Sequence, residues 1–401
     1  MARRSFAPSI RSHETHRADH PPVRIGPRLV PRPRGVRQVR RRSVVSAPAS
    51  TGNASTGNAA ASLATAAAQP VGAGAPAHRA RVPLSQQTVV FGLFVLIFIG
   101  FAVFLPGFFR VDNLLTLLQS VSVLGILGLG MALIVIGRGI DLSMVATLVV
   151  APGLMLQMVS DGHPLWLAGF AALALTLAVG LFNGWLIAFA EVPSLFATLA
   201  SGLLLAGLGQ AAFFRLDIVQ WNAGMDAVAW IARGTVFGVP RPVVVFALLT
   251  LLVSGFLRWM RLGTFVYAIG DNPQAARSAG IAIRPVILLQ YLLSSLIAAL
   301  AGLVMAISVS SMPVLIFNST LIYDVILVVV LGGIGLAGGR GGALSAVVGT
   351  LLIGTLLNGM TILDVSYSAQ NLIKGLILLV AIAVDSFVNP RNEQTAQQGD
   401  I

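Results

Sequence analysis

The chain alternates between long apolar stretches and short polar connections. Most of the apolar stretches hold about 17–25 residues, the length with which a helix crosses a bilayer. They are rich in Leu, Val, Ala and Gly and carry few charges, which favours helices over the alternating pattern of outer-membrane barrels. The sequence therefore predicts an all-α polytopic membrane protein with about ten transmembrane helices. The ten stretches lie at about 88–105, 113–136, 142–159, 165–190, 194–214, 242–257, 285–309, 320–337, 343–361 and 369–387.

Composition and charge separate a membrane body from an N-terminal segment. The chain is 56% hydrophobic and 10% charged over 401 residues, whereas soluble domains hold about 45–50% apolar and about 25% charged residues. Residues 1–87 carry fourteen arginines against two acids, an excess that accounts for the whole formal charge of +12. Because the remainder is neutral, the basic balance indicates no nucleic-acid partner.

Residues 1–87 are rich in Arg, Pro, Ala and Ser. Such a segment buries too little apolar surface to offset its ordering entropy, so we expect a disordered basic cytoplasmic tail with loose attraction to anionic membrane lipid. Arg3 and Arg4 resemble the start of a twin-arginine export signal, but no apolar region follows for about eighty residues. An organellar transit peptide and a start codon assigned too early are the alternatives. Residues 88–388 form the expected membrane domain, and 389–401 a second cytoplasmic tail.

Basic residues predict the orientation of the helices. Arg79 and Arg81 precede the first apolar stretch, which places the N-terminus in the cytoplasm, and an even number of spans returns the C-terminus to the same side. The longest outward connection is then 215–241, whose Trp221 and Trp230 lie flat at the membrane interface or belong to a rim that receives a binding protein. This orientation puts Arg138, Arg258, Arg261, Arg277, Arg284, Arg340 and Arg391 inside, and Arg110, Arg215, Arg233 and Arg241 outside.

A polar, glycine-bearing segment at 258–284 separates the sixth and seventh apolar stretches. Its backbone would lose hydrogen bonds in hydrocarbon, so it projects into water, on the cytoplasmic side. It resembles the coupling loop of the bacterial monosaccharide ABC importer permeases (the ribose, xylose and arabinose group), G-R-x-x-Y-A-I-G-G-N-x-x-A-A-R-x-x-G-I. Thr264 and Asp271 depart from that pattern. The matching residues are Gly263, Tyr267, Ala268, Ile269, Gly270, Asn272, Ala275, Ala276, Arg277, Gly280 and Ile281.

Three further motifs resemble the same family. Residues 137–143 are similar to its G-I-D-L-S-V-G-S signature, although Met144, Val145 and Ala146 replace the final V-G-S. Asp141 or Ser143 either caps the next helix or has a direct role in transport. Residues 192–199 resemble I-P-S-F-I-A-T-L. Asn183, inside an apolar stretch, hydrogen-bonds another helix or lines the path. The glycine-rich residues 331–342 are similar to L-G-G-x-S-L-x-G-G-x-G.

The chain lacks the sequence features of an ATP-binding protein. A phosphate loop of the form G-x-x-x-x-G-K-[ST] needs a lysine, and Lys374, the single lysine, has no such context. If transport is driven by ATP, the nucleotide must therefore bind a separate ATPase chain, and no cofactor is expected on this one.

Polar residues inside the apolar stretches are candidates for the translocation path, because they are costly in a membrane unless they serve a function. Lys374 and Asp324 are hypothesised to form a pair, the alternative being that both extend to the interface. The candidates are Asp141, Ser143, Asn183, Asp324, Asn358, Gln370 and Lys374.

The resemblance implies a permease subunit of an ABC importer in the bacterial inner membrane. It implies a second permease chain, identical or different, an ABC ATPase that docks on the 258–284 segment, and a periplasmic sugar-binding protein. The expected cargo is a pentose or hexose such as ribose or xylose; related permeases carry an autoinducer furanone or a nucleoside.

Two other classes are weaker. A secondary transporter or channel coupled to ions needs buried acids or histidines, but all five histidines lie outside the apolar stretches and Asp324 is the one acid plainly inside. An intramembrane enzyme needs a nucleophile or paired acids, and there is no cysteine, while His163 has only Asp161 nearby in the sequence. We therefore expect no catalytic residue, no metal site and no enzymatic activity.

Overall fold

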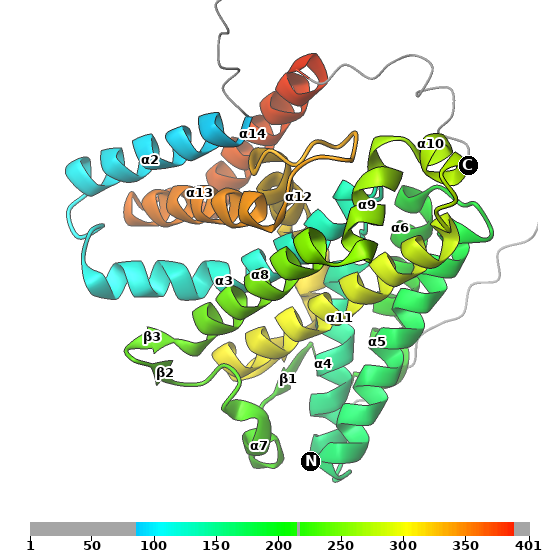
Figure 1. The fold of residues 1–401 in the computed structure, drawn as a ribbon. Helices are drawn as coiled ribbons and strands as arrows, with labels where there is room; N and C mark the ends of the chain where they lie inside the picture. Colours follow the sequence, from blue (N-terminus) through cyan, green and yellow to red (C-terminus); the bar gives the residue numbers. More distant parts are fainter. Residues whose placement is uncertain (1–85, 215–216, 389–401) are drawn as a thin grey trace, which may run out of the picture. The chain divides into compact units, whose positions relative to one another are not determined.

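The computed structural model describes residues 86–214 and 217–388, which contain ten apolar helices (Figure 1). Each of the ten predicted stretches corresponds to one helix, so the prediction of an all-α polytopic membrane protein is confirmed. Six helices are long and apolar enough to cross a membrane, and four have shorter apolar runs. The helices are α2 (Gln86–Phe104), α3 (Val111–Ile136), α4 (Met144–Ser160), α5 (Leu165–Ala188), α6 (Ser194–Leu208), α8 (Arg241–Trp259), α11 (Ile283–Val309), α12 (Leu321–Leu331), α13 (Ala343–Ile362) and α14 (Tyr367–Val388).

The predicted tails lie almost wholly outside the described residues. Helix α2 begins at Gln86, two residues before the expected boundary, and α14 ends at Val388. The predictions for residues 1–85 and 389–401 are therefore not addressed by the structure.

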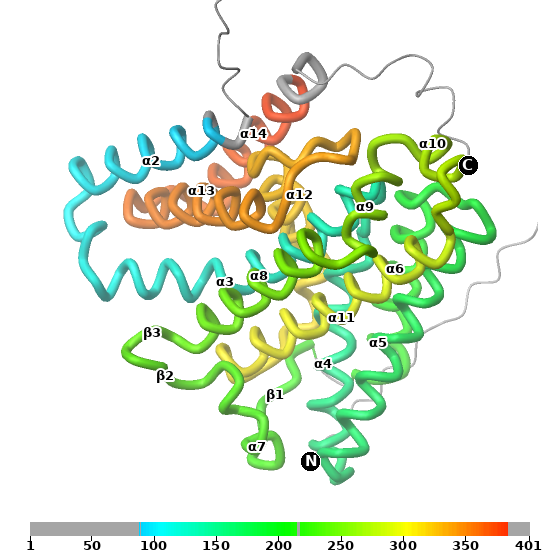
Figure 2. The backbone as a smooth tube through the Cα atoms, viewed as in Figure 1, coloured from blue at the N-terminus to red at the C-terminus, as the bar shows by residue number. Residues whose placement is uncertain are grey.

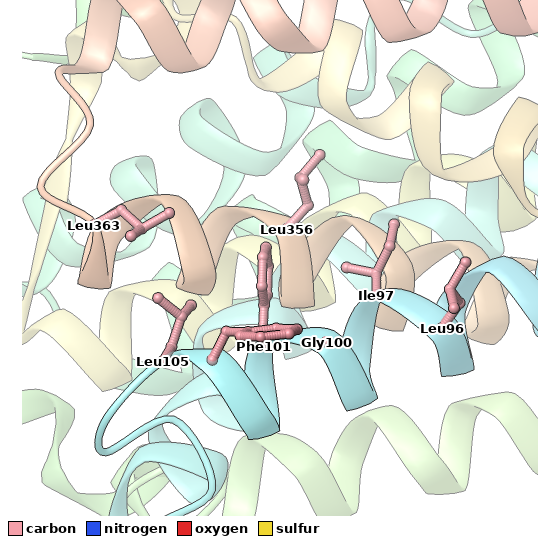
Figure 3. A pocket seen from close by; sticks show the side chains of 8 residues that line it. Leu96, Ile97, Gly100, Phe101, Leu105, Leu356 and Leu363 are labelled. Atoms are coloured by element: carbon pink, nitrogen blue, oxygen red, sulfur yellow. The ribbon is translucent and has the colours of Figure 1, made fainter.

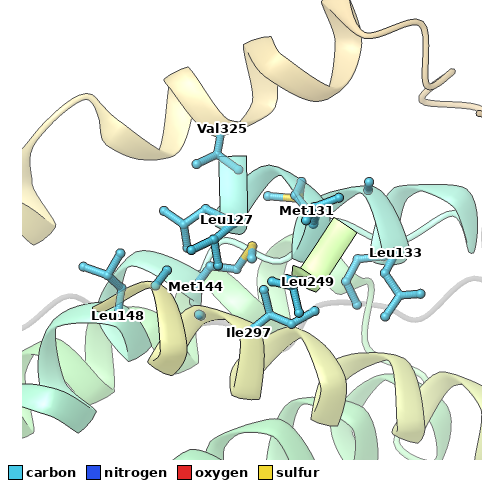
Figure 4. Packing of buried hydrophobic residues seen from close by; sticks show 14 of the residues in the cluster. Leu127, Met131, Leu133, Met144, Leu148, Leu249, Ile297 and Val325 are labelled. Carbon is cyan, nitrogen blue, oxygen red and sulfur yellow. The ribbon is translucent and has the colours of Figure 1, made fainter. Parts of the chain in front are cut away.

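Helix α3 lies at the centre of the packing. It contacts α8, α11, α12 and α13, while α11 also packs against α4 and α5. Every residue from Leu124 to Ile136 is buried. Figure 4 shows Leu127, Met131 and Leu133 of α3 among side chains from four other helices. These partners are Met144, Leu148, Leu249, Ile297 and Val325. A helix surrounded in this way has no face left for lipid in its second half.

Short elements close one end of the helices. A π-helical turn, η1 (Gly209–Phe213), ends α6. Strand β1 (Ile218–Gln220) pairs antiparallel with β4 (Ser311–Pro313), and β2 (Thr235–Val236) pairs with β3 (Val239–Pro240) as a hairpin. The remaining pieces are η2 (Ala223–Met225), α7 (Asp226–Ala229) and η3 (Val314–Asn318).

The two tryptophans of the 217–240 segment have different surroundings. The Trp221 indole donates a hydrogen bond to Asp226 at 2.9 Å, and the Arg233 guanidinium lies 5.2 Å from the centre of its ring. Trp230 is 67% exposed. Trp221 is therefore held by this segment itself, whereas Trp230 is open to the surroundings of the protein.

Candidate functional site

The segment between α8 and α11 forms two short helices, α9 (Arg261–Asp271) and α10 (Pro273–Ser278), visible as a bend in the chain in Figure 2. The Asn272 side chain accepts hydrogen bonds from the backbone N–H groups of Gln274 and Ala275, both at 3.0 Å, and so caps α10. Gly280 has a φ of +81°, which allows the chain to reverse after α10. Asn272 and Gly280 therefore shape this element.

One face of α9 is held against the membrane helices by close backbone contacts. A Cβ on Gly263 would collide with the carbonyl oxygen of Phe256 on α8. A Cβ on Gly270 would collide with the carbonyl oxygen of Ile136 at the end of α3 and would lie 2.6 Å from the backbone nitrogen of Gly339. Only glycine fits at these two positions, so they fix the distance between α9 and its neighbours.

The glycine-rich loop between α12 and α13 completes this contact. The Gly339 N–H donates to the Ile136 carbonyl at 2.8 Å, and the Tyr267 hydroxyl donates to the Gly341 carbonyl at 2.8 Å. Burial raises the pKa of the Tyr267 phenol, so it stays protonated and able to donate at neutral pH. The loop thereby joins α9 to α3, α12 and α13 through one backbone hydrogen bond and one bond from a side chain to the backbone.

The predicted coupling residues fall into three groups. Gly263, Tyr267, Gly270 and Ala276 face inward; Ala276 is 4% exposed and Tyr267 half-buried. Asn272 and Gly280 are exposed and shape the turns. Ala275 and Arg277 remain on the exposed face of α10, where a partner can reach them.

Sequence reasoning missed the contact of this element with Ile136 and the glycine-rich loop. The signal was present as the glycine cluster at 331–342, but its partner lies about seventy residues earlier in the chain, and spacing alone does not pair such segments.

A second cluster forms around Asp141 in the turn between α3 and α4. Its carboxylate accepts hydrogen bonds from the Ser143 backbone N–H at 3.0 Å, the Ser143 hydroxyl at 2.6 Å and the Ser294 hydroxyl of α11 at 2.7 Å. The Asn183 amide of α5 donates to the Ser143 hydroxyl at 2.8 Å. Asp141, Ser143 and Asn183 are each 1% exposed. The structure thus brings three path candidates together in a closed cluster.

The same turn is also bound to α6. Ser194 accepts from the Ile140 N–H at 3.2 Å, and Thr198 accepts from the Leu142 N–H at 3.0 Å. Three helices, α5, α6 and α11, therefore hold residues 137–143 by hydrogen bonds to their backbone and side chains. This accounts for the serine and threonine of the motif at 192–199.

Replacing Asp141 by alanine is expected to lower the melting temperature of the purified protein in detergent. The change leaves two hydroxyls and one backbone N–H buried without their acceptor, at about 1–3 kcal/mol for each unsatisfied group. Asp161→Ala is the control, because Asp161 is an exposed acid at the end of α4. Equal melting temperatures for the two variants would contradict the proposed role of the Asp141 cluster.

The remaining path candidates lie in separate places. Lys374 forms an ion pair with Asp324 at 2.8 Å, with side chains 8% and 14% exposed, as hypothesised from the sequence. The Asn358 and Asn113 amides exchange two hydrogen bonds, at 3.0 and 3.1 Å, between α13 and α3. Gln370 donates to the Val365 carbonyl at 2.9 Å. Their place in a translocation path stays a prediction.

One apolar groove is unsuited to a sugar. It lies between α2 and the end of α13 and exposes only hydrocarbon side chains (Figure 3). A hydroxylated solute needs polar groups to replace its hydrogen bonds with water. The groove is lined by Leu96, Ile97, Gly100, Phe101, Phe104, Leu105, Leu356 and Leu363.

In the ranges 86–214 and 217–388, no three His, Cys, Asp or Glu side chains gather as metal ligands.

Comparison with known proteins relates these features to a family. Residues 113–382 match a family model described as the permease component of the branched-chain amino acid transport system. The ribose import permease RbsC of Escherichia coli K12 is 34% identical over 305 residues, which are 76% of this chain and 94% of that protein. The galactofuranose transporter permease YtfT of the same strain is 31% identical over 321 residues, 78% of this chain and 92% of that protein.

A more distant relative adds to this set. The xylose transport permease XylH of Haemophilus influenzae is 30% identical over 336 residues, covering 68% of this chain and 88% of that protein. No solved structure matches the chain.

Ten apolar helices and this similarity define a multi-pass membrane transport permease. The chain belongs to the permease family whose model it matches, and the resemblance to monosaccharide ABC importer permeases found in its motifs is confirmed.

Proposed function

We propose that this chain is the permease subunit of an ABC importer that brings a sugar, a pentose or hexose such as ribose or xylose, into the cytoplasm. The similarity to the ribose, galactofuranose and xylose permeases supports a sugar over the amino acids in the family's description. A furanone or nucleoside cargo is the alternative within the same mechanism.

The observation that carries the proposal is the α9–α10 element. It offers Ala275 and Arg277 on an exposed face, while Gly263, Gly270 and Ala276 hold its other face to the membrane helices. An element that is exposed on one side and rigidly attached on the other is suited to receive a displacement from a docked ATPase.

The displacement has a short route into the membrane. A shift of α10 moves α9, and Gly270 transmits the shift to Ile136 of α3 and to Gly339 of the glycine-rich loop through backbone contacts. Close-packed contacts transmit strain because they cannot compress. Helices α3, α12 and α13 then change their positions, and the solute site opens alternately to each side of the membrane.

In this proposal both termini lie in the cytoplasm, together with α9 and α10. ATP binds only the separate ATPase, and this chain carries no cofactor and performs no chemistry. A periplasmic binding protein delivers the sugar to the opposite face, and a second permease chain completes the path.

Arg277→Glu is expected to release the ATPase from detergent-solubilised complex, since it reverses a charge on the exposed face of α10. The measurement is the amount of ATPase that co-purifies with the tagged permease. The matched control is Arg110→Glu, an arginine that is also exposed and lies on the predicted outer side.

Equal recovery of the ATPase with both variants would contradict docking at α10. Uphill solute movement by the purified chain alone in liposomes, with no ATPase present, would contradict the ABC mechanism as a whole.

A further inference from the structure

The first half of α3 carries a row of exposed polar side chains that the sequence motifs did not indicate. Asp112, Thr116, Gln119 and Ser120 are all exposed. Their spacing of four, three and one residues places them on one side of the helix. We call these four residues the α3 polar row.

Polar side chains at similar depth in other long helices are buried. Thr176 of α5, Thr250 of α8, and Gln290 and Ser294 of α11 are all less than 9% exposed. Between Val244 and Leu252 the exposed side chains of α8 are instead apolar, for example Leu248 at 57%. This is the arrangement expected of helices that contact lipid. The α3 polar row has the opposite pattern.

Gln119 lies within the apolar span of α3 and not at its end. It is eight residues after the start of the helix, which is about 12 Å along the helix axis. No hydrogen bond joins its amide to another residue in the described part of the chain. An amide that faces hydrocarbon without a partner is strongly disfavoured, so something polar must cover this side.

The hydroxyl oxygens of Thr116 and Ser120 are free to accept hydrogen bonds. Thr116 donates to the Asp112 carbonyl and Ser120 donates to the Thr116 carbonyl, both at 2.8 Å. Their donors are satisfied inside the helix, whereas the oxygen lone pairs remain available. Together with the Gln119 amide, the row offers acceptors and donors suited to the hydroxyls of a sugar.

The row has a definite inner end. Val123, on the same side of α3, is half-buried, and from Leu124 to Ile136 the helix is buried on all sides. The polar surface therefore extends from the start of α3 to about its middle and stops where the central packing begins.

We propose that the α3 polar row lines the outer part of the solute path and hydrogen-bonds a polyhydroxylated solute during its entry. This inference rests on the proposed function and its orientation, in which α3 begins at the outer face. It places the water-accessible lining of the solute path on α3, whereas the sequence motifs pointed to the buried cluster around Asp141.

The chain contains no cysteine, so single cysteines can be introduced into it without any background reaction. Gln119→Cys and Thr116→Cys are treated with a membrane-impermeant thiol reagent in spheroplasts and in inverted vesicles. Because the reactive thiolate forms where water reaches the sulfur, we expect both to react from outside at least about tenfold faster than the control. The control is Leu248→Cys, at comparable depth on the exposed apolar face of α8. Ribose or xylose in excess is expected to slow the reaction.

Two results would overturn the inference. The first is a labelling rate of Gln119→Cys that is as slow as the rate of Leu248→Cys from both sides of the membrane, which would place the row in lipid. The other is a disulfide between two copies of Gln119→Cys together with no labelling, which would place the row in a contact between copies. Labelling requires neither ATPase nor uptake, so its outcome is separate from a failure of the ABC mechanism, which the liposome assay detects.

Discussion

Gly270→Ala is expected to reduce reconstituted ATP-driven uptake at least about tenfold, although it adds only one methyl group. The new Cβ collides with the Ile136 carbonyl oxygen and lies 2.6 Å from the Gly339 nitrogen. Neither partner is a flexible side chain, so α9 must move away from α3 or the glycine-rich loop must open. Uptake into proteoliposomes and the amount of membrane-inserted protein are the two measurements.

The control for Gly270→Ala is Gly375→Ala in α14, where an added Cβ meets nothing within 4 Å. This variant should insert and transport normally. If Gly270→Ala also transports normally, the close contact between α9, α3 and the glycine-rich loop does not carry the coupling.

Breaking the Lys374–Asp324 pair is expected to have the second-largest effect. Removing one partner of a buried pair leaves an uncompensated charge and typically costs about 3–5 kcal/mol. Asp324→Asn and Lys374→Met should each lower the melting temperature in detergent sharply. The exchanged pair, Asp324→Lys with Lys374→Asp, should recover most of the loss, because the opposite charges again meet.

The comparison for this pair is Glu191→Gln, which breaks the Arg284–Glu191 pair at 3.3 Å, with side chains 54% and 43% exposed. An exposed pair contributes about 0–1 kcal/mol, so its loss should hardly change the melting temperature. Failure of the exchanged pair to recover the melting temperature would contradict a stabilising Lys374–Asp324 pair.

The positions of the helices were predictable from the sequence for a simple reason. A segment that crosses hydrocarbon must be apolar over its whole length, and the polar connections interrupt it. The short strands and helical turns at 217–240 were not predictable from the sequence. Strand β1 pairs with β4, which lies after α11, and no local pattern links two strands of three residues.

The candidate site was only partly predictable. The motif residues around 261–281 were found, but their division into inward and exposed faces depends on Gly339 and Ile136, which come from other parts of the chain. The Lys374–Asp324 pair was found because two opposite charges in apolar helices need each other. The α3 polar row was missed because the sequence does not show which side of α3 is exposed, and exposure is what distinguishes these residues from the buried polar side chains of other helices.

The two faces of α9 and α10 differ in what they tolerate. Positions 263 and 270 admit no side chain at all, whereas Ala275 and Arg277 meet open solvent. If α9 and α10 receive the ATPase as proposed, exchanging a few surface residues of α10 would adapt the permease to the motor subunit of another transporter and leave the glycine contacts of α9 unchanged.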